Sequence, residues 1–358
     1  MKFNFKKEAS QAIDYILFPS IYYFIDEQKK NEDELLEQVI SEEYMSFIEK
    51  ITTLLEPYKD EISKFYNEDI YATYDFSNIL IHGFPIYDYH SEHEYLRDLS
   101  KMNEADLRRV MIKTLLTMDD DEGSEEDYRL NEATAISYIN GLNIDSSNKW
   151  NLLMMIQKPK DYLKDFIALL EKVQSLFYSY YEKKVSEATE YGMALAKRLS
   201  EDTENTFKEI THDAIHYDFS ESENCYLYVS VIFPYSLRFS NDDDCRIIWG
   251  MNMEKSWKKL YEIREDKLSE RVKIFKALGD KTRYGTLKLL ASGESSIKEI
   301  ANKLDVSSAT ISYHVNEFLT SGIVNLKLEK SKKSGYKVDY DKLEEVMMEL
   351  KSDLNFPE

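Results

Sequence analysis

Short hydrogen-bonding side chains crowd one stretch near the C-terminal end of the chain. They are Ser307, Ser308, Thr310, Ser312, Tyr313, His314 and Asn316. Hydroxyl, amide and imidazole groups of this kind can bond to the edges of bases and to phosphate oxygens. His314 could instead cap the helix or brace it against the phosphate backbone. Further along, Lys330, Lys332 and Lys333 lie in the basic run KSKKSG, whose charges suit a phosphate backbone. These positions are therefore the candidate interface with double-stranded DNA.

The elements around this stretch would present it to a groove. Ser296 is expected to cap a helix over 297–304, and Asp305 and Val306 to form a tight turn. Ser308 is expected to cap the next helix, over 309–320. Two short helices joined by a short turn form a helix-turn-helix, whose second helix places its N-terminal half in the major groove. The residues predicted to face inward on this second helix are Ile311, Val315, Phe318 and Leu319.

The flanking segments complete a winged domain. Two helices are predicted before the motif, over 269–278 and 281–291. After it, alternating apolar residues on both sides of the basic run predict a β-hairpin, or wing, followed by an amphipathic helix over 341–354. The predicted inward positions are Val272, Phe275 and Leu278 on the first helix, Tyr284, Leu287 and Leu290 on the second, and Leu343, Val346, Met347 and Leu350 on the last.

Residues 269–343 resemble the ArsR/SmtB family of winged-helix regulators. The matching stretches are FKALGDKTRYGTLKLL, IKEIANKLDVSSATISYHVNEFLTSGIV and GYKVDYDKL. The resemblance implies a DNA-binding transcription regulator that forms a homodimer through its outer helices, 269–278 and 341–354. The chain lacks the Cys-x-Cys element that some members use for metal sensing, and it carries some 265 residues before the domain.

Composition is consistent with a largely helical protein of more than one domain. The chain has 358 residues, with only 10 Gly and 6 Pro. Its net charge of −21 argues against a nucleic-acid surface over the whole molecule. Residues 266–342 hold 15 Lys and Arg against 10 Asp and Glu, however, whereas the rest holds 31 against 57. A mildly basic segment on an acidic body is typical of a DNA reader with a separate regulatory region.

The predicted fold is mainly α, with a helical N-terminal region over 1–265 and a winged helix-turn-helix domain with its C-terminal helix over 266–358. Helices are expected up to about residue 118, then an acidic loop and possible sub-boundary at 118–130, and a further helix over 132–157. The stretch 162–210 predicts one long helix, or two in succession with a bend near Gly192. This stretch could also add to a dimer interface. A small hairpin or sheet is predicted within 225–250, and a connecting helix over 253–267.

Two groups of histidines could ligate a metal, although structural or solvated roles are commoner for such residues. One group is His82, His90 and His93 with Asp88 and Glu92, and the other is His212 and His216 with Asp213. Cys225 and Cys245 are the only cysteines and form neither a zinc spacing nor a disulfide framework. No nucleotide-binding loop or nucleophile signature is present. We therefore expect no metal, cofactor or catalytic residue.

The resulting hypothesis is a cytoplasmic transcription regulator whose acidic N-terminal region senses a small molecule or a protein. No window approaches the roughly 20 apolar residues that span a bilayer, so no membrane partner is expected. The alternative is a bifunctional protein in which a metal-dependent enzymatic region is tethered to the DNA-binding domain. A third interpretation, in which the winged helix makes only protein contacts, predicts no binding to duplex DNA.

Overall fold

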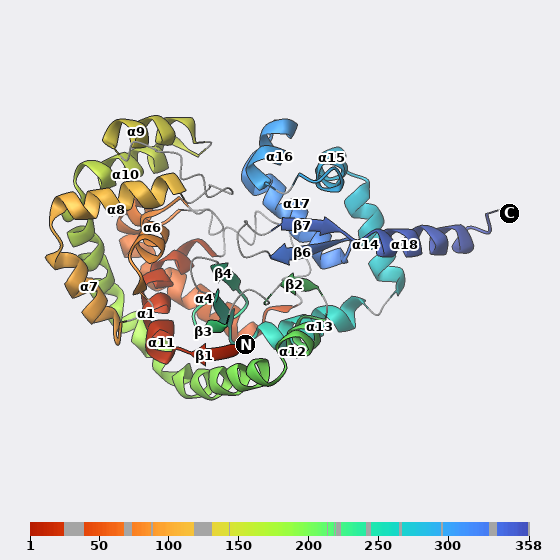
Figure 1. Ribbon diagram of the computed structural model, residues 1–358, viewed down its shortest axis with the longest axis horizontal. Helices are drawn as coiled ribbons and strands as arrows, with labels where there is room; N and C mark the ends of the chain where they lie inside the picture. Colours follow the sequence, from red (N-terminus) through yellow and green to blue (C-terminus); the bar gives the residue numbers. More distant parts are fainter. Residues whose placement is uncertain are drawn as a thin grey trace. The chain divides into compact units, whose positions relative to one another are not determined.

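The computed structural model describes residues 1–24, 39–67, 74–86, 89–117, 131–142, 144–212, 214–217, 219, 223–240, 245–264, 267–294, 296–328 and 335–356. The chain divides into two compact units, shown in Figure 1. The larger unit is built mainly from residues 1–24, Ile40–Ser200 and Asn224–Met253. The smaller unit, called here the winged-helix unit, is built mainly from Glu201–Glu223 and Glu254–Glu358. Both are dominated by helices, which confirms the predicted mainly α fold.

The larger unit surrounds a small sheet with helices. Its helices are α1 (Lys7–Leu17), η1 (Phe18–Tyr23), α4 (Glu42–Leu55), η2 (Glu56–Tyr58), α5 (Lys59–Phe65), α6 (Phe76–Gly83), α7 (Glu92–Lys101), α8 (Glu104–Thr117), α9 (Glu132–Gly141), α10 (Ser146–Gln157) and α11 (Pro159–Glu201). Its strands are β1 (Lys2–Phe5), β3 (Asn224–Ser230), β4 (Leu237–Ser240) and β5 (Cys245–Gly250). The predicted loop and sub-boundary at 118–130 lie outside the described residues.

The sheet of the larger unit has the order β1-β3-β5-β4. β1 and β5 both pair parallel with β3, and β4 pairs antiparallel with β5. The prediction of helices from the first residue was therefore wrong for β1. This strand of only four residues gains its hydrogen bonds from β3, more than two hundred positions away, which no local pattern reveals.

The long predicted helix is present as α11, which continues through Gly192 as helix. The helix runs to Glu201, and a second helix begins after Asp202, whose side chain caps it by accepting from the Asn205 amide. Gly192 instead makes room for β1, because a Cβ there would lie 2.5 Å from the Phe5 ring. One face of α11, including Phe166, Val173 and Phe177, is fully buried and forms core rather than an exposed stripe.

Most side chains of helix α1 are buried, and the helix docks on the end of β3. The Asp14 carboxylate accepts hydrogen bonds from the Val231 amide at 2.7 Å, the Ile232 amide at 3.2 Å and the Ser230 hydroxyl at 2.5 Å. Burial raises the pKa of Asp14 to about 7, and these hydrogen bonds oppose the shift. A buried carboxylate therefore fixes where α1 lies against the sheet.

The winged-helix unit contains the predicted motif and three elements outside it. Its elements are α12 (Thr203–Thr211), β2 (Ile215–Tyr217), α13 (Met253–Arg264), α14 (Lys267–Leu278), α15 (Lys281–Ala291), α16 (Ile297–Leu304), α17 (Ser308–Ser321), β6 (Val324–Leu328), β7 (Gly335–Val338) and α18 (Tyr340–Asp353). We expected a boundary between 265 and 266. The structure instead groups α12, β2 and most of α13 with this unit.

A strand from outside the predicted domain extends the wing sheet. β6 and β7 form the expected antiparallel pair, with Val324 opposite Val338. β2 pairs parallel with the other edge of β6, with Ile215 opposite Leu326, so the sheet has the order β2-β6-β7 (Figure 1). The open edge that a two-stranded wing would leave on β6 is thus covered by the chain itself.

Candidate nucleic-acid interface

Helices α16 and α17 form the helix-turn-helix, and local hydrogen bonds define both ends of the turn. Ser296 caps α16 by accepting from the Glu299 amide at 3.3 Å. The helix ends at Asp305, which adopts a left-handed conformation with φ of 55°. The Val306 amide then donates to the Ala301 carbonyl at 3.1 Å. Aspartate tolerates this conformation better than most residues, so it suits the tight turn.

The cap of α17 is one residue earlier than predicted. The Ser307 hydroxyl accepts from the Thr310 amide at 3.0 Å and lies 2.8 Å from the Thr310 hydroxyl. Ser308, which we expected to be the cap, is the first residue of the helix. The N-terminal turn thereby carries hydroxyl groups at three of its first four positions, counting Ser307. Such an end suits contacts with phosphates and base edges.

A hydrophobic core beneath α17 fixes which side chains can reach outward. Ile311, Val315 and Phe318 are at most 1% exposed and pack with α14, α15 and α16, as predicted. Of the remaining predicted contact residues on α17 and its cap, Ser307 is exposed, and five are partly exposed. Those five are Ser308, Thr310, Ser312, Tyr313 and Asn316.

His314 does not lie on the exposed face. It is only 6% exposed, and neither ring nitrogen has a hydrogen-bond partner among the described residues. Its position follows Ile311 by three residues and precedes Phe318 by four, so helical geometry places it on the buried face. Burial, followed by the charge of Arg283, lowers the pKa of His314, while Asp280 opposes the shift. The assignment of His314 as an exposed contact is corrected accordingly.

Arg283 on α15 supports the neighbouring Tyr313, and the sequence did not single it out. Its guanidinium lies 5.8 Å from the centre of the Tyr313 ring, and its Nη1 is 3.0 Å from Glu317 Oε2. Arg283 thus joins α15 to the outer face of α17 and restricts the Tyr313 side chain. Its signals in the sequence were its place one turn after the α15 cap at Asp280 and its position within the family-like stretch FKALGDKTRYGTLKLL.

Lys330, Lys332 and Lys333 lie outside the described residues, so their predicted role stays a prediction. The strands that flank them, β6 and β7, are present.

Comparison with known proteins agrees with this geometry. A family model described as a helix-turn-helix domain matches residues 278–327, from the end of α14 into β6. An uncharacterized HTH-type transcriptional regulator of Methanocaldococcus jannaschii is 37% identical over 83 residues, which are 23% of this chain and 92% of that protein. The chain belongs to the helix-turn-helix transcriptional regulators. No solved structure matches it.

Membership in this family makes the winged-helix unit of the regulator a DNA-binding module. The match covers nearly all of that relative but less than a quarter of this chain. In the described part of the regulator, no helix is long and apolar enough to cross a membrane.

The histidines of the regulator do not gather around a metal in the described residues, where no group of three potential ligands is found. His93 is paired with buried Glu92, Nδ1 to Oε1 3.0 Å, and with Gln174. His212 closes α12 in a left-handed conformation and stacks on Tyr261, with ring centres 4.4 Å apart. Asp88, Asp213 and the side chain of His216 lie outside the described residues.

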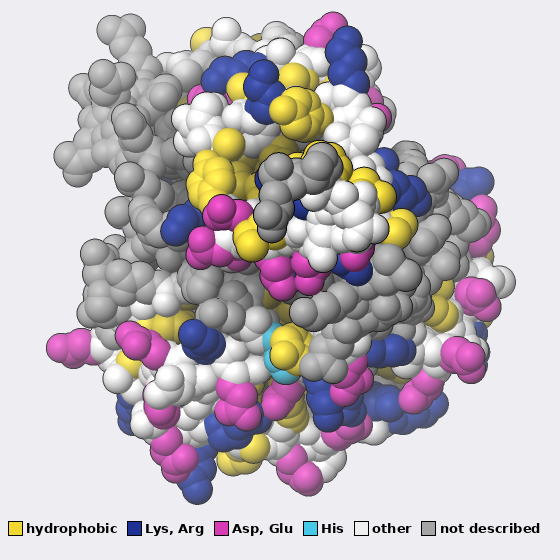
Figure 2. All heavy atoms as spheres, turned by 90° about the vertical axis from the view of Figure 1, so that its right-hand side faces the viewer, with side chains coloured by type: hydrophobic (Ala, Val, Ile, Leu, Met, Phe, Trp, Pro, Cys, Tyr) yellow, Lys and Arg dark blue, Asp and Glu magenta, His cyan; other side chains and the backbone are white. Residues whose placement is uncertain are grey.

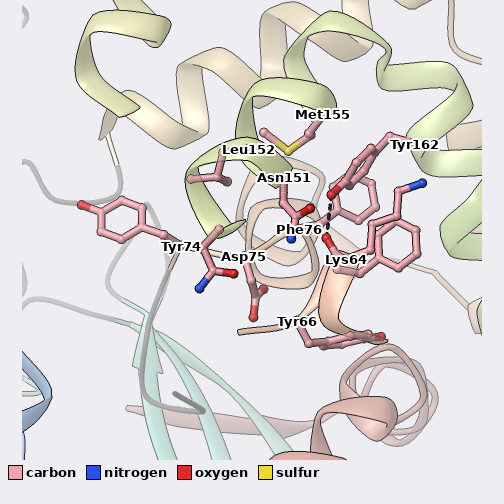
Figure 3. Close-up of a pocket in the computed structure, with 11 residues that line it drawn as sticks. Lys64, Tyr66, Tyr74, Asp75, Phe76, Asn151, Leu152, Met155 and Tyr162 are labelled. Atoms are coloured by element: carbon pink, nitrogen blue, oxygen red, sulfur yellow. Dashed lines mark hydrogen bonds between the residues drawn. The ribbon is translucent and has the colours of Figure 1, made fainter. Parts of the chain in front are cut away.

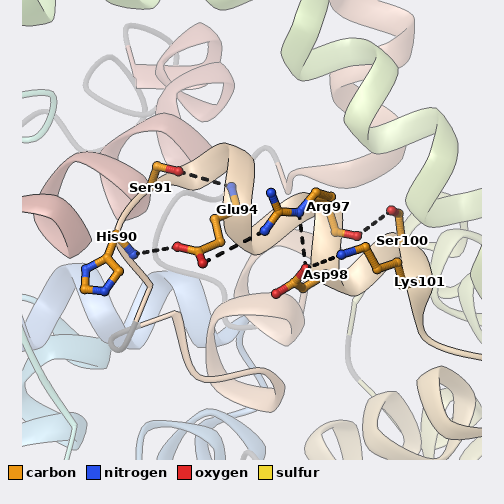
Figure 4. Close-up of polar contacts among 7 residues, drawn as sticks. All are labelled: His90, Ser91, Glu94, Arg97, Asp98, Ser100 and Lys101. Atoms are coloured by element: carbon orange, nitrogen blue, oxygen red, sulfur yellow. Dashed lines mark hydrogen bonds and ion pairs between the residues drawn. The ribbon is translucent and has the colours of Figure 1, made fainter.

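The segment around His90 is a helix cap followed by surface ion pairs (Figure 4). The Ser91 hydroxyl accepts from the Glu94 amide at 3.2 Å, and the Glu94 carboxylate accepts from the His90 amide at 3.2 Å. Arg97, Asp98 and Lys101 continue as exposed pairs along α7. The polar and charged residues near His90 therefore cap the N-terminus of α7 and form its solvent-exposed surface.

A pocket lies in the larger unit of the regulator between α5, α6, α10 and α11 (Figure 3). It is a small hollow that is partly open to solvent, and its enclosed space has room for about one water molecule. Much of its polar lining is already engaged. The Tyr162 hydroxyl donates to the Lys64 carbonyl at 2.6 Å, Asn151 donates to the Ser63 carbonyl at 2.9 Å, and Asp75 caps α6. Its apolar walls combine the aromatic rings of Phe65, Tyr66 and Phe76 with aliphatic side chains from α10.

Proposed function

We propose that this regulator is ArsR-like, reads a two-fold-related operator as a homodimer, and responds to an effector through its larger unit. The observation that carries the proposal is the exposed, hydroxyl-rich N-terminal half of α17, held over a packed core by α15 and α16. One such helix covers too few base pairs for genomic specificity, so a paired arrangement is required.

The outer helices support the homodimer. α14 and α18 are joined by Arg271, whose Nη1 lies 2.9 Å from Asp353 and 3.5 Å from Glu349. Both helices leave large apolar side chains in solvent, each between 48% and 63% exposed. Figure 2 shows hydrophobic side chains at the surface beside Lys and Arg on the side that faces right in Figure 1. The exposed residues on these helices and the segment after α18 are Val272, Tyr340, Met347, Met348, Leu354 and Phe356.

These exposures differ from the sequence prediction, and the difference fits a dimer. Val272 was expected to face the domain core, but it is 59% exposed, and Ile274 and Ala277 fill that place. Met347 was expected to pack inward and is 48% exposed. The helices are apolar on two sides, whereas a helix of a monomeric domain needs only one.

The dimer is tested with a charge placed on this face. Met348→Glu should shift sedimentation from dimer to monomer and weaken operator binding. The matched control is Trp150→Glu, since Met348 and Trp150 are both 63% exposed and Trp150 lies in the larger unit. A monomeric wild-type protein, both free and on DNA, would contradict the proposal.

Operator reading is tested at Tyr313. Tyr313→Ala should reduce the preference for operator over random duplex by roughly 1–3 kcal/mol, the usual value of a good base contact. The control is Thr320→Ala at the C-terminal end of the same helix, whose hydroxyl bonds to the Asn316 carbonyl. The measurement is competition against random duplex at fixed salt. Equal loss of specific and non-specific binding would make Tyr313 a backbone contact.

The contribution of the wing lysines to DNA binding is tested through the salt dependence of the affinity. Replacing Lys330, Lys332 and Lys333 by Ala should weaken binding to all duplexes alike. It should also lower the slope of log affinity against log salt by up to about 0.9 per lost phosphate contact. An unchanged slope would remove the wing from the interface.

The effector is proposed to bind in the larger unit at the pocket of Figure 3, which must widen to admit it. Asn151→Trp would narrow the pocket from α10 at a partly exposed position. A compound that raises the melting temperature of the wild type and changes its operator affinity, but has neither effect on this variant, would support the site. An unaltered response of the variant would exclude it.

A further inference from the structure

The two cysteines of the chain face each other across neighbouring strands of the larger unit. Cys225 on β3 and Cys245 on β5 are register partners, and their sulfur atoms lie 2.7 Å apart. Adjacent strands are about 4.8 Å apart, which falls within the range of Cα separations that disulfides span. A bond between the two sulfurs therefore needs only a small displacement of the side chains.

We infer that Cys225 and Cys245 are a redox modification site that forms a reversible disulfide within the sheet β1-β3-β5-β4. They are the only cysteines in the sequence, so no other thiol of the same chain competes for either one. Both face the same side of the sheet, as register partners of a pleated sheet must.

The buried surroundings of the two cysteines make disulfide formation slow, but they favour a bond between these two sulfurs. The residues are 0% and 1% exposed, and burial raises the pKa of the Cys225 thiol. Because the thiolate is the nucleophile, reaction requires opening of the sheet near these strand ends. Large oxidants and partner thiols reach the sulfurs only when the sheet opens, whereas the neighbouring sulfur remains in contact.

Formation of the disulfide needs a two-electron oxidant, and a peroxide can serve as one. One thiol loses its proton and its sulfur attacks a peroxide oxygen, which gives a sulfenic acid and one water. The second sulfur then displaces the hydroxyl group as water and the S–S bond forms. Two electrons pass from the sulfurs to the peroxide, and both thiol protons leave in water. A dithiol such as dithiothreitol reverses the step by exchange.

The first test compares the folded with the unfolded chain at equilibrium. The full-length protein is incubated in glutathione redox buffers, with and without urea, and its thiols are then alkylated and counted by mass. An unfolded loop of this length holds its thiols at an effective concentration of about millimolar, and the fold should raise this about tenfold or more. The folded chain should thus oxidise in more reducing buffers than the unfolded chain. Equal or weaker oxidation of the folded chain would overturn the inference.

The second test locates the bond. Trypsin can cut after Arg238 and Arg246, so the two cysteines fall in separate peptides. After peroxide treatment, non-reduced digests should contain these peptides linked, and dithiothreitol should release them. Cys245→Ser is the control, because it retains one thiol and cannot form the link. A wild-type protein that gives only intermolecular links, or none, would contradict the assignment whether or not the variant folds.

Discussion

The larger unit and the winged-helix unit each bury an ionisable side chain on a helix, but in different ways. In the larger unit, Asp14 on α1 receives hydrogen bonds from residues 216 to 218 positions away. In the winged-helix unit, His314 on α17 is buried by the spacing of its own helix and has no hydrogen-bond partner among the described residues. The first core is organised by long-range contacts, and the second by helices that are short, capped and close in sequence.

The largest losses of stability should come from substitutions in the two hydrophobic cores. Each substitution should destabilise only the unit that contains it. Phe318 and Phe166 are both 0% exposed, one in each unit. Phe318→Ala should destabilise the winged-helix unit and Phe166→Ala the larger unit, each by about 3–5 kcal/mol. Calorimetry should show one transition moving in each variant. A joint shift of all transitions would mean that the units unfold as one, and the comparison would fail.

The stability of the larger unit should depend on pH through the ionisation of Asp14. Because its pKa is raised to about 7 in the fold, the protonated form is favoured there. Its contribution is complete below the unfolded pKa, near 4, and is lost as pH rises through about 7. Asp14→Asn keeps a neutral amide, so its stability relative to wild type should increase between pH 4 and 8. The total change is on the order of 4 kcal/mol.

The measurement is denaturant unfolding across that pH range, with exposed Asp60→Asn as the control. A constant difference between the Asp14 variant and wild type would show that the carboxylate stays ionised in the fold.

The placement of β2 can be tested at Ile215, which is 5% exposed in the wing sheet. Ile215→Ala should lower the unfolding free energy of the winged-helix unit by about 2–4 kcal/mol. Ile247→Ala in β5, at 0% exposure, is the matched change in the other sheet and should affect the larger unit. If Ile215→Ala moves the transition of the larger unit instead, β2 belongs to that unit.

His314 should give the winged-helix unit a pH dependence of opposite sign. Its pKa is lowered in the fold, so its contribution is complete above the ordinary histidine value of 6.5 and decreases as pH falls below it. The winged-helix transition should therefore move down in acid, and His314→Asn should remove this part of the slope. Exposed His90→Asn serves as the control. A wild-type transition that is flat from pH 7 to 5 would contradict the burial of the imidazole.

The smallest effect is expected for the ion pairs on the surface of α7. Arg97 is 60% exposed and lies 3.3 Å from Asp98. Arg97→Ala should change stability by no more than about 0.5 kcal/mol. Arg271, only 16% exposed between α14 and α18, should matter more, by about 1 kcal/mol. Urea unfolding of both variants gives the comparison, and equal losses would mean that burial does not separate them.

The sequence alone determined the helix-turn-helix, its wing strands and most of the outward residues of α17. Caps, turns and helical spacing involve residues within a few positions, so the signals at Ser296, Asp280 and Ile311 could be read directly. The same helical spacing also predicts the burial of His314, because this residue lies on the helix face of Ile311 and Phe318. That position was misassigned because the polar residue type was weighed above its place in the period.

Only the tertiary structure decided the short strands and the contacts they create. β1 and β2 are four and three residues long, and each exists because it pairs with a strand far along the chain. The contact between Cys225 and Cys245 likewise depends on β3 and β5 being neighbours in this register, although β4 lies between them in the sequence. Such pairings depend on which chain segments meet after folding. A strand of three or four residues is too short for its pattern of apolar and polar residues to identify its partner strand.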